Sequence, residues 1–333
     1  MKEVILTGIK PTNDIHIGNY LGAIKPAIKF VKENPNTDFY YFIADYHALT
    51  SMRDPESFNH YVYSVAATWL ACGLDPKRCV IYRQSDIPEV FELNWLLACM
   101  TPKGDMNRAH SYKAILQTNQ ENKRDLDYGV NMGLYSYPIL MAADILLFDT
   151  HKVPVGKDQI QHIEIARSIA QRINEVYKDD IFREPQEFIN EKTGYIPGLD
   201  GRKMSKSYDN GIPLFSTEKK LKKLINKIKT DSTDAEAPKD PDSSLVMDFY
   251  KLFARAEAIS DLEKRLRKGL GWGYAKQELF EVMNKEIAPQ REKYDALMDD
   301  KSKIDQILTD GASKARLVAR EVLDRVKSKM CHY

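Results

Sequence analysis

Two lysines stand three residues apart in the segment Gly201-Arg202-Lys203-Met204-Ser205-Lys206-Ser207, which glycine and serine bracket. Ammonium groups on flexible stems can neutralise the charge of a triphosphate chain, so Lys203 and Lys206 are candidates for binding a nucleotide. A solvated basic loop would have a similar composition, and this segment alone does not separate the two interpretations.

A second candidate nucleotide contact follows the first apolar run of the chain. Residues 4–6 predict a buried strand, and residues 7–19 form a turn before a helix begins. In a doubly wound sheet such a turn presents helix N–H groups to phosphate, and Gly18 lets a ligand approach the backbone closely. His16 and Asn19 can donate hydrogen bonds to charge that develops on a phosphoryl oxygen. An ordinary turn capped by Asn19 is the alternative, and the Walker A pattern is absent.

A single carboxylate interrupts an apolar segment near the middle of the chain. Asp144 stands between Ala142-Ala143 and Ile145-Leu146-Leu147. Burial of an unpaired carboxylate is costly, so Asp144 should have a dedicated hydrogen-bond donor. A capping or surface aspartate is the alternative, which the apolar neighbours disfavour.

A third polar group, Gly156-Lys157-Asp158-Gln159, lies where a predicted strand ends and a helix opens. The carboxylate of Asp158 can accept both ribose hydroxyls of a nucleotide there, and Gly156 gives the nucleotide room. His162 is four residues after Asp158 on the same helical face, but a lone histidine is more often structural than functional.

Alternating strands and helices must position these groups. Short β-rich runs at residues 4–6, 39–43, 79–82 and 152–155 alternate with amphipathic stretches at residues 20–32, 55–72, 89–100, 105–117, 135–148 and 158–177. This pattern predicts parallel βαβ units, and hence an α/β fold with a doubly wound parallel sheet over residues 1–200. Residues 119–130 crowd polar side chains without an apolar period and predict an exposed, mobile insertion.

The pattern changes after Gly211, where apolar residues recur at helical spacing and no convincing strand follows. We expect a loop at residues 201–212, an all-α domain at residues 213–310, and a terminal helix at residues 311–333 that packs back on the α/β domain. Residues 218–229 predict a basic amphipathic helix, which either contacts RNA phosphates or is a solvated lysine face.

Composition excludes several classes of protein. The 333 residues are 43% hydrophobic, which allows a substantial core and excludes a disordered chain. The 49 basic and 48 acidic residues give a formal charge of +1, so any RNA contact must use local patches. Four cysteines without a C-x-x-C pair predict neither zinc nor an iron–sulfur cluster. Without a signal h-region or a long apolar run, we expect a cytoplasmic protein with no membrane span.

Several of these motifs resemble one family. Lys-Met-Ser-Lys-Ser at residues 203–207 is the signature of class I aminoacyl-tRNA synthetases, and His16-Ile17-Gly18-Asn19 resembles their His-Ile-Gly-His motif. Residues 42–50, 137–147 and 153–162 are similar to the bacterial tryptophanyl-tRNA synthetases. The resemblance runs from the first strand to the C-terminal helix and is weakest over residues 119–130 and before Lys203. Tyrosyl-tRNA synthetases are related, but usually carry a Gly-Gly-Ser-Asp-Gln version of the segment that holds Asp158.

The resemblance implies a Rossmann-like catalytic domain and a set of site residues. The catalytic residues would be His16, Asn19, Lys203 and Lys206. ATP would contact Lys10, Pro11, Thr12, Gly18, Asn19, Gly156, Lys157, Asp158, Ile196, Lys203, Met204, Ser205, Lys206 and Ser207. Tryptophan would give its indole N–H to Asp144 and would also contact Tyr137, Met141, Val153, Val155, Gln159 and His47. Lys113 resembles a phosphate-reaching lysine of the family, whereas Lys10 and Asn13 depart from its usual glutamine and glycine.

The activity implied by the resemblance is a two-step reaction. L-tryptophan reacts with ATP and its Mg²⁺ to give tryptophanyl-adenylate and pyrophosphate, and tryptophan is then transferred to tRNA(Trp). No metal is expected other than the Mg²⁺ that accompanies ATP. The resemblance also implies a homodimer and anticodon recognition by the helical domain. A tyrosyl-tRNA synthetase, a non-catalytic nucleotide- or RNA-binding relative and a general adenylyltransferase are the alternatives.

Overall fold

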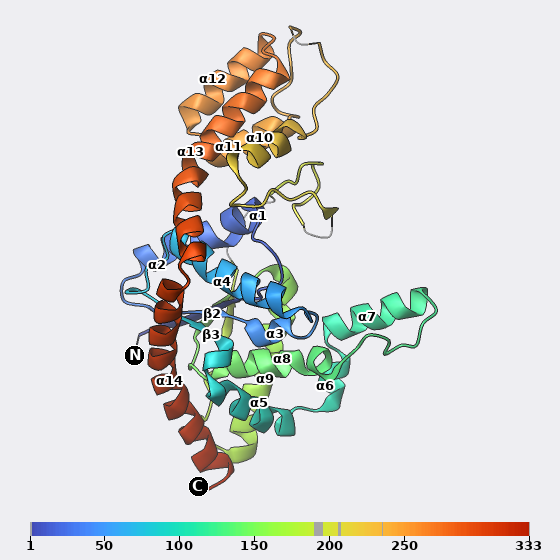
Figure 1. Cartoon of the computed structure of the whole chain (residues 1–333). Coiled ribbons are helices and arrows are strands. Elements are labelled where there is room, and N and C mark those ends of the chain that lie inside the picture. The colour runs from blue at the N-terminus through green and yellow to red at the C-terminus, as the bar shows by residue number, and fades with distance from the viewer. Residues whose placement is uncertain (1, 190–195, 206–207, 235, 333) are drawn as a thin grey trace.

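A parallel sheet forms the centre of the molecule in the computed structural model, which describes residues 2–189, 196–205, 208–234 and 236–332 (Figure 1). Its five strands lie in the order β3-β2-β1-β4-β5. The strands are β1 (Val4–Ile9), β2 (Asp38–Ile43), β3 (Val80–Arg83), β4 (Lys152–Pro154) and β5 (Gln186–Phe188). Every pairing is parallel, with Val4 opposite Asp38 and Tyr40 opposite Val80.

Helices cover both faces of this sheet, because successive strand residues point to opposite sides. Phe39 and Tyr41 pack with α2 (Lys25–Glu33) and α4 (Pro55–Ala71) on one face. Tyr40 and Phe42 pack with α5 (Pro88–Met100), α8 (Met132–Leu146) and α9 (Ile160–Tyr177) on the other. The predicted doubly wound α/β fold is therefore confirmed.

The predicted elements differ from the observed ones in three places. The helix expected at residues 105–117 is two helices, α6 and α7, and the helix expected at residues 20–32 begins with a π-helical turn, η1. Strand β5 was not predicted, because its three residues carry little apolar periodicity. The remaining short elements are α1 (Ile17–Asn19), η1 (Tyr20–Ile24), α3 (Asp45–Ala48), η2 (Gln84–Asp86), α6 (Lys103–Asn107), α7 (His110–Glu121) and η3 (Lys157–Gln159).

The segment predicted as an exposed insertion, residues 119–130, is partly helical. Helix α7 continues to Glu121 and projects from the sheet domain (Figure 1). Asn119 is buried, so the expectation of exposure is wrong at this residue. Its Nδ2 atom donates to the carbonyl oxygens of Leu126 and Tyr128, both at 2.8 Å, and this pairing holds the following turn against the helix. The mobility of the segment stays a prediction.

The C-terminal part of the described chain is helical. Helices α10 (Glu218–Asn226), α11 (Leu245–Phe253), α12 (Ala256–Arg267) and α13 (Trp272–Asp299) gather at one end of the molecule, and α14 (Ser302–Met330) runs back along the sheet domain (Figure 1). The predicted boundary between residues 310 and 311 is wrong, because it falls inside α14. In the described residues, no helix combines the length and the apolar character needed to cross a membrane.

Helix α14 packs directly on the edge of the sheet. A Cβ atom at Gly311 would lie 1.8 Å from the carbonyl oxygen of Ile81 in β3, so only glycine permits this approach. Further along α14, Arg316 and Arg320 donate to the buried carboxylate of Glu89 at the start of α5. Arg325 forms a second ion pair with Asp149. These contacts fix the C-terminal helix to the sheet domain.

We expect Gly311→Ala to lower the free energy of unfolding by roughly 1–3 kcal/mol, because the new methyl group clashes with the backbone of β3. Alanine is otherwise the better helix former by about 1 kcal/mol, so the clash must reverse the usual sign. Thermal denaturation measures the difference. Gly273→Ala in α13 is the matched control, since its Cβ would meet no atom within 4 Å. Equal melting temperatures for wild type and Gly311→Ala would contradict the close approach.

Candidate active site

The groups singled out in the sequence gather at the carboxyl ends of the strands. β1 leads into the turn that carries His16, and β4 leads into Gly156. These two strands are neighbours, and the chain leaves them toward opposite sides of the sheet. In doubly wound sheets this switch point opens a crevice in which ligands bind.

The turn after β1 is fixed by a reciprocal pair of hydrogen bonds. His16 is the N-cap of α1, and its Nδ1 atom accepts from the backbone N–H of Asn19 at 3.2 Å. The side-chain oxygen of Asn19 accepts from the backbone N–H of His16, also at 3.2 Å. This is a capping-box arrangement. The amide nitrogen of Asn19 is not part of this pair, which suits it for contact with a ligand.

The described part of residues 201–212, which carries Lys203 and is called the lysine loop below, lies directly against this turn, as the yellow segment beside α1 in Figure 1 shows. The backbone N–H of Gly18 points at the sulfur of Met204, with nitrogen and sulfur 3.2 Å apart, and Met204 is buried. The backbone N–H of Ile17 donates to the carbonyl of Ile212 at 2.8 Å. Lys203 is exposed beside these contacts. The two predicted motifs, 186 residues apart, therefore form one surface.

Asn210 holds the lysine loop in shape through three hydrogen bonds, a role that the sequence analysis did not predict. It is buried; its Oδ1 accepts from the backbone N–H of Ser205 at 2.9 Å, and its Nδ2 donates to Asp200 at 2.8 Å and to the carbonyl of Lys203. The hydrogen bond from Asn210 and the Arg202 guanidinium lower the pKa of Asp200 to about 2. The Asp209-Asn210-Gly211 run was a turn signal that could have indicated this role.

Three other predicted residues belong to the loop region, and the structure describes one of them. Ile196 accepts from the backbone N–H of Met204 through its carbonyl, at 2.9 Å. Lys206 and Ser207 lie outside the described residues.

Asp144 is buried in α8, with 2% of its surface exposed. Its Oδ2 lies 2.8 Å from Nε2 of His47 in α3. Nε2 of Gln84, directly after β3, lies 2.8 Å from Oδ1 and 2.9 Å from Oδ2. Burial raises the pKa of Asp144, while the bonds from His47 and Gln84 oppose this shift by stabilising the charged form. The carboxylate thus has protein donors, which the sequence prediction did not include.

Gln84 was also missed in the sequence. A signal was present, because Gln84-Ser85-Asp86 is a polar run immediately after a predicted strand, at the sheet edge where ligands bind.

Of the predicted apolar walls, Val153, Met141 and Val155 belong to the same hydrophobic cluster as Ala143 and Ile145, the neighbours of Asp144. Val153 is buried in β4, whereas Met141, Val155 and Tyr137 are half-buried. The hydroxyl of Tyr137 and Nε2 of His162 lie 2.9 Å apart and share a hydrogen bond. Burial lowers the pKa of His162, which favours the neutral ring. The sequence analysis favoured a structural role for His162. In the structure, His162 holds the hydroxyl of Tyr137, which is a candidate binding residue.

Residues 156–159 form the turn η3 after β4. The amide of Gln159 donates to the carboxylate of Asp158 at 2.9 Å. A Cβ at Gly156 would lie 2.7 Å from that same carboxylate, so glycine gives Asp158 its place. Asp158 and Lys157 are exposed, as contact with a nucleotide requires.

Two predicted lysines lie away from these clusters. Lys10 donates to the hydroxyl of Thr50 at 2.9 Å, in the loop after α3, while Pro11 and Thr12 continue the turn. Lys113 is exposed on α7, and the described structure gives it no contact with the other candidates. In the described residues, His, Cys, Asp and Glu side chains form no cluster that could hold a metal ion.

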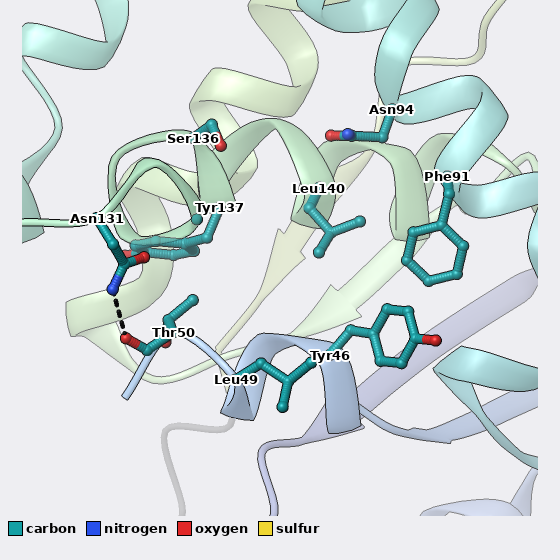
Figure 2. Close-up of a pocket in the computed structure, with 10 residues that line it drawn as sticks. Tyr46, Leu49, Thr50, Phe91, Asn94, Asn131, Ser136, Tyr137 and Leu140 are labelled. Atoms are coloured by element: carbon teal, nitrogen blue, oxygen red, sulfur yellow. Dashed lines mark hydrogen bonds between the residues drawn. The ribbon is translucent and has the colours of Figure 1, made fainter. Parts of the chain in front are cut away.

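A separate groove of about 280 Å³ lies between α3, α5 and α8 (Figure 2). Tyr46 and Leu49 from α3 face Phe91 from α5 and Leu140 from α8 across it. Of the predicted site residues, only Tyr137 lines this groove. It is therefore distinct from the surface formed by Gly18 and Met204.

Comparisons with known proteins agree with the geometry. The family model described as class I tRNA synthetases (W and Y) matches residues 2–288. A tryptophan–tRNA ligase of Neisseria meningitidis serogroup A is 51% identical over 98% of this chain and 97% of its own length. One from Pseudomonas aeruginosa is 52% identical over 96% of this chain and 71% of its own length. The solved tryptophanyl-tRNA synthetase of Campylobacter jejuni, complexed with ADP and tryptophan, superposes with a TM-score of 0.91 at 44% identity, covering 98% of this chain and 99% of its own.

Proposed function

The chain belongs to the class I tRNA synthetases of the tryptophan and tyrosine group, and we infer that it activates L-tryptophan with ATP and transfers it to tRNA. The observation that carries this choice is the buried carboxylate of Asp144, which lies among apolar side chains and is hydrogen-bonded to His47 and Gln84. An indole ring has the apolar surface and the single N–H donor that such a site requires. The tyrosine alternative is not favoured, since the relatives named above act on tryptophan.

We propose that the first step is attack of the tryptophan carboxylate on the α-phosphorus of ATP. A new bond joins the carboxylate oxygen to phosphorus, and pyrophosphate leaves with its electron pair. Lys203 and Lys206 neutralise the leaving group, together with the Mg²⁺ that enters with ATP as part of the substrate. His16 and Asn19 donate to the phosphoryl oxygens of the adenylate. In the second step a ribose hydroxyl at the tRNA 3′ end attacks the adenylate carbonyl and releases AMP.

The remaining nucleotide contacts are proposed from the same surface. Gly18 offers its backbone, Asp158 accepts from the ribose hydroxyls, and Gly156 leaves room for the sugar. Lys10 and Lys113 would have to reach the phosphates from outside this cluster. Gln159, beside Asp158, would orient the polar end of tryptophan, while Tyr137, Met141, Val153 and Val155 contact its ring.

For tRNA(Trp), we propose that α10 contacts the phosphate backbone. Leu221 and Ile225 bury one side of this helix, so its lysines gather on the exposed side. Helix α10 itself lies next to the lysine loop, where the tRNA 3′ end must arrive (Figure 1). Lysine contacts with phosphate release counterions and strengthen binding at low salt. Anticodon recognition is assigned to the other helices of this domain.

We propose that two copies of the chain form a dimer through the groove between α3, α5 and α8. Tyr46 and Leu49 at this groove are 41% and 47% exposed, and Trp95 on α5 is 70% exposed. Large apolar groups exposed together are typical of protein interfaces.

We also propose a cytoplasmic location, which follows from the proposed role in translation.

Exchange of labelled pyrophosphate into ATP tests the proposed function directly. We expect exchange with L-tryptophan, and less than about a hundredth of that rate with tyrosine or phenylalanine, because each leaves a polar group or the Asp144 acceptor without its partner. Charging of tRNA(Trp) should follow. Exchange that depends on tyrosine instead would identify the rival family member, and tRNA binding without any exchange would indicate a non-catalytic relative.

Lys203→Ala should slow adenylate formation by on the order of a hundredfold to a thousandfold, as expected for loss of a group that stabilises transition-state charge. The affinity for tryptophan should change little, because the lysine does not reach the indole pocket. Single-turnover formation of the adenylate gives the rate, and equilibrium titration gives the affinity. Lys264→Ala, an exposed lysine on α12, is the control. An unchanged rate of adenylate formation for Lys203→Ala would show that Lys203 does not stabilise the transition state.

The double substitution Leu49→Glu, at the groove, with Trp95→Glu, on α5 beside it, should convert the dimer to a monomer, because four like charges would be buried in the proposed interface. Sedimentation equilibrium measures the mass in solution. Leu317→Glu is the matched control, since Leu317 on α14 is 69% exposed but lies on another surface. If the double variant stays dimeric, the interface lies elsewhere.

A further inference from the structure

Gln84 is a buried amide to which the proposed reaction has assigned no role. It is the first residue of η2, and its side chain is 0% exposed. An ionised carboxylate only accepts hydrogen bonds, so Gln84 must present Nε2 to Asp144 and turn Oε1 away. No group in the described residues donates to that Oε1. The contact with Asp144 therefore decides how this side chain is oriented.

The hydrogen bonds around Asp144 leave limited space for another donor. A carboxylate offers about four acceptor positions on its two oxygens. His47 occupies one on Oδ2, and the amide nitrogen of Gln84 bridges Oδ1 and Oδ2 at 2.8 and 2.9 Å. One acceptor position on Oδ1 remains. A single N–H donor from a ligand would complete the set.

The chemistry of the protein donors also matters. An arginine or lysine next to Asp144 would neutralise its charge and weaken its attraction for a neutral N–H group. The amide of Gln84 carries no net charge, so it orients the carboxylate and leaves its charge in place. A buried, oriented carboxylate that keeps its charge is a strong acceptor for an indole N–H.

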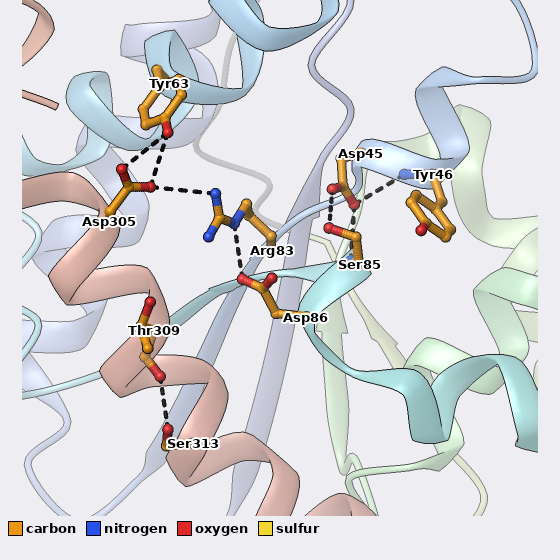
Figure 3. Close-up of polar contacts among 9 residues, drawn as sticks. All are labelled: Asp45, Tyr46, Tyr63, Arg83, Ser85, Asp86, Asp305, Thr309 and Ser313. Atoms are coloured by element: carbon orange, nitrogen blue, oxygen red, sulfur yellow. Dashed lines mark hydrogen bonds and ion pairs between the residues drawn. The ribbon is translucent and has the colours of Figure 1, made fainter. Parts of the chain in front are cut away.

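The backbone around Gln84 is held in place by its neighbour Ser85 (Figure 3). The N–H and hydroxyl of Ser85 donate to the two carboxylate oxygens of Asp45, at 3.0 and 2.5 Å. Asp45 is buried and is the first residue of α3, the helix that carries His47. One contact therefore fixes the elements that supply both donors to Asp144.

The residue before Gln84 ties the same segment to the C-terminal helix. Arg83 donates to Asp86 at 2.8 Å and to Asp305 of α14 at 3.3 Å, and Asp305 also accepts from the hydroxyl of Tyr63 (Figure 3). Three successive residues, Arg83, Gln84 and Ser85, thus contact α14, α8 and α3. The position of Gln84 is fixed from both sides.

We propose that Gln84 is a positioning residue that orients the Asp144 carboxylate and leaves one of its acceptor positions for the indole N–H of tryptophan. The proposal rests on the proposed function, because it names what Gln84 does for that substrate. If Gln84 only filled space in the core, its loss would destabilise the fold without a specific effect on the binding of tryptophan.

Gln84→Met keeps the length of the side chain and removes the donor. We expect the KM for tryptophan in pyrophosphate exchange to rise on the order of tenfold to a hundredfold, as for loss of a hydrogen bond to a charged group. The KM for ATP should change less than threefold, and kcat should fall less than the affinity for tryptophan. Equal effects on both substrates, or no effect on tryptophan, would overturn the proposal.

The pH profile gives a second readout. Without the Gln84 donor the pKa of Asp144 rises further, so the variant holds a protonated, weaker acceptor at low pH. Its KM for tryptophan should therefore fall as pH rises, more steeply than in wild type. The other titratable groups nearby are His47 from α3, Tyr82 from β3 and, beyond Tyr137, His162 from α9. All remain in both proteins, so parallel profiles would overturn the proposal.

A double-mutant cycle tests whether Gln84 acts through Asp144. In an Asp144→Asn background, Gln84→Met should change the KM for tryptophan less than twofold, because the group that it orients has lost its charge. Additive effects would overturn the proposal. Thr150→Val is the control for loss of a buried polar side chain, since Thr150 is buried and lies in the turn after α8. The melting temperatures of the two variants are compared, and the KM of Thr150→Val for tryptophan should equal that of wild type.

Different results would contradict the proposed function and the proposed role of Gln84. If wild type shows no exchange with tryptophan, the proposed function is wrong. If wild type exchanges with tryptophan and Gln84→Met retains its KM and pH profile, only the role of Gln84 is wrong.

Discussion

A carboxylate inside an apolar interior is unstable unless hydrogen-bond donors hold it, and the architecture around Asp144 is arranged to supply them. His47 comes from the end of β2 and Gln84 from the end of β3, while Asp144 itself lies on α8. The strand ends must lie at fixed distances for the three side chains to meet, which the parallel register of β2 and β3 provides. The position of the Asp144 carboxylate and its two partners thus depends on the pairing of two strands.

The surface proposed to bind the nucleotide depends on a contact between two loops rather than on hydrogen bonds to a carboxylate. The turn after β1 and the lysine loop are 186 residues apart, and they meet through the backbone of Gly18 and the buried sulfur of Met204. Asn210 holds the loop in shape, and Lys203 stays exposed beside it. The proposed amino-acid contacts therefore lie on buried groups, whereas the proposed phosphate contact Lys203 lies on an exposed loop.

The sequence predicted much of this because local signals were strong. Periodicity located four of the five strands, and the apolar neighbours of Asp144 indicated its burial. The failures have physical causes. β5 is three residues long with little pattern, and the break between α6 and α7 has no proline or glycine to mark it. Gln84 and Asn210 were missed because their roles depend on partners 60 and 10 residues away, which periodicity does not reveal.

An isosteric ligand tests most directly whether Asp144 recognises the ring N–H of tryptophan. In 3-(3-benzothienyl)alanine a sulfur atom replaces the indole N–H, while the shape and apolar surface are nearly unchanged. Isothermal titration should show binding weaker than that of tryptophan by on the order of tenfold to a hundredfold, the value of one hydrogen bond to a charged acceptor. Equal affinities for the two amino acids would contradict the account.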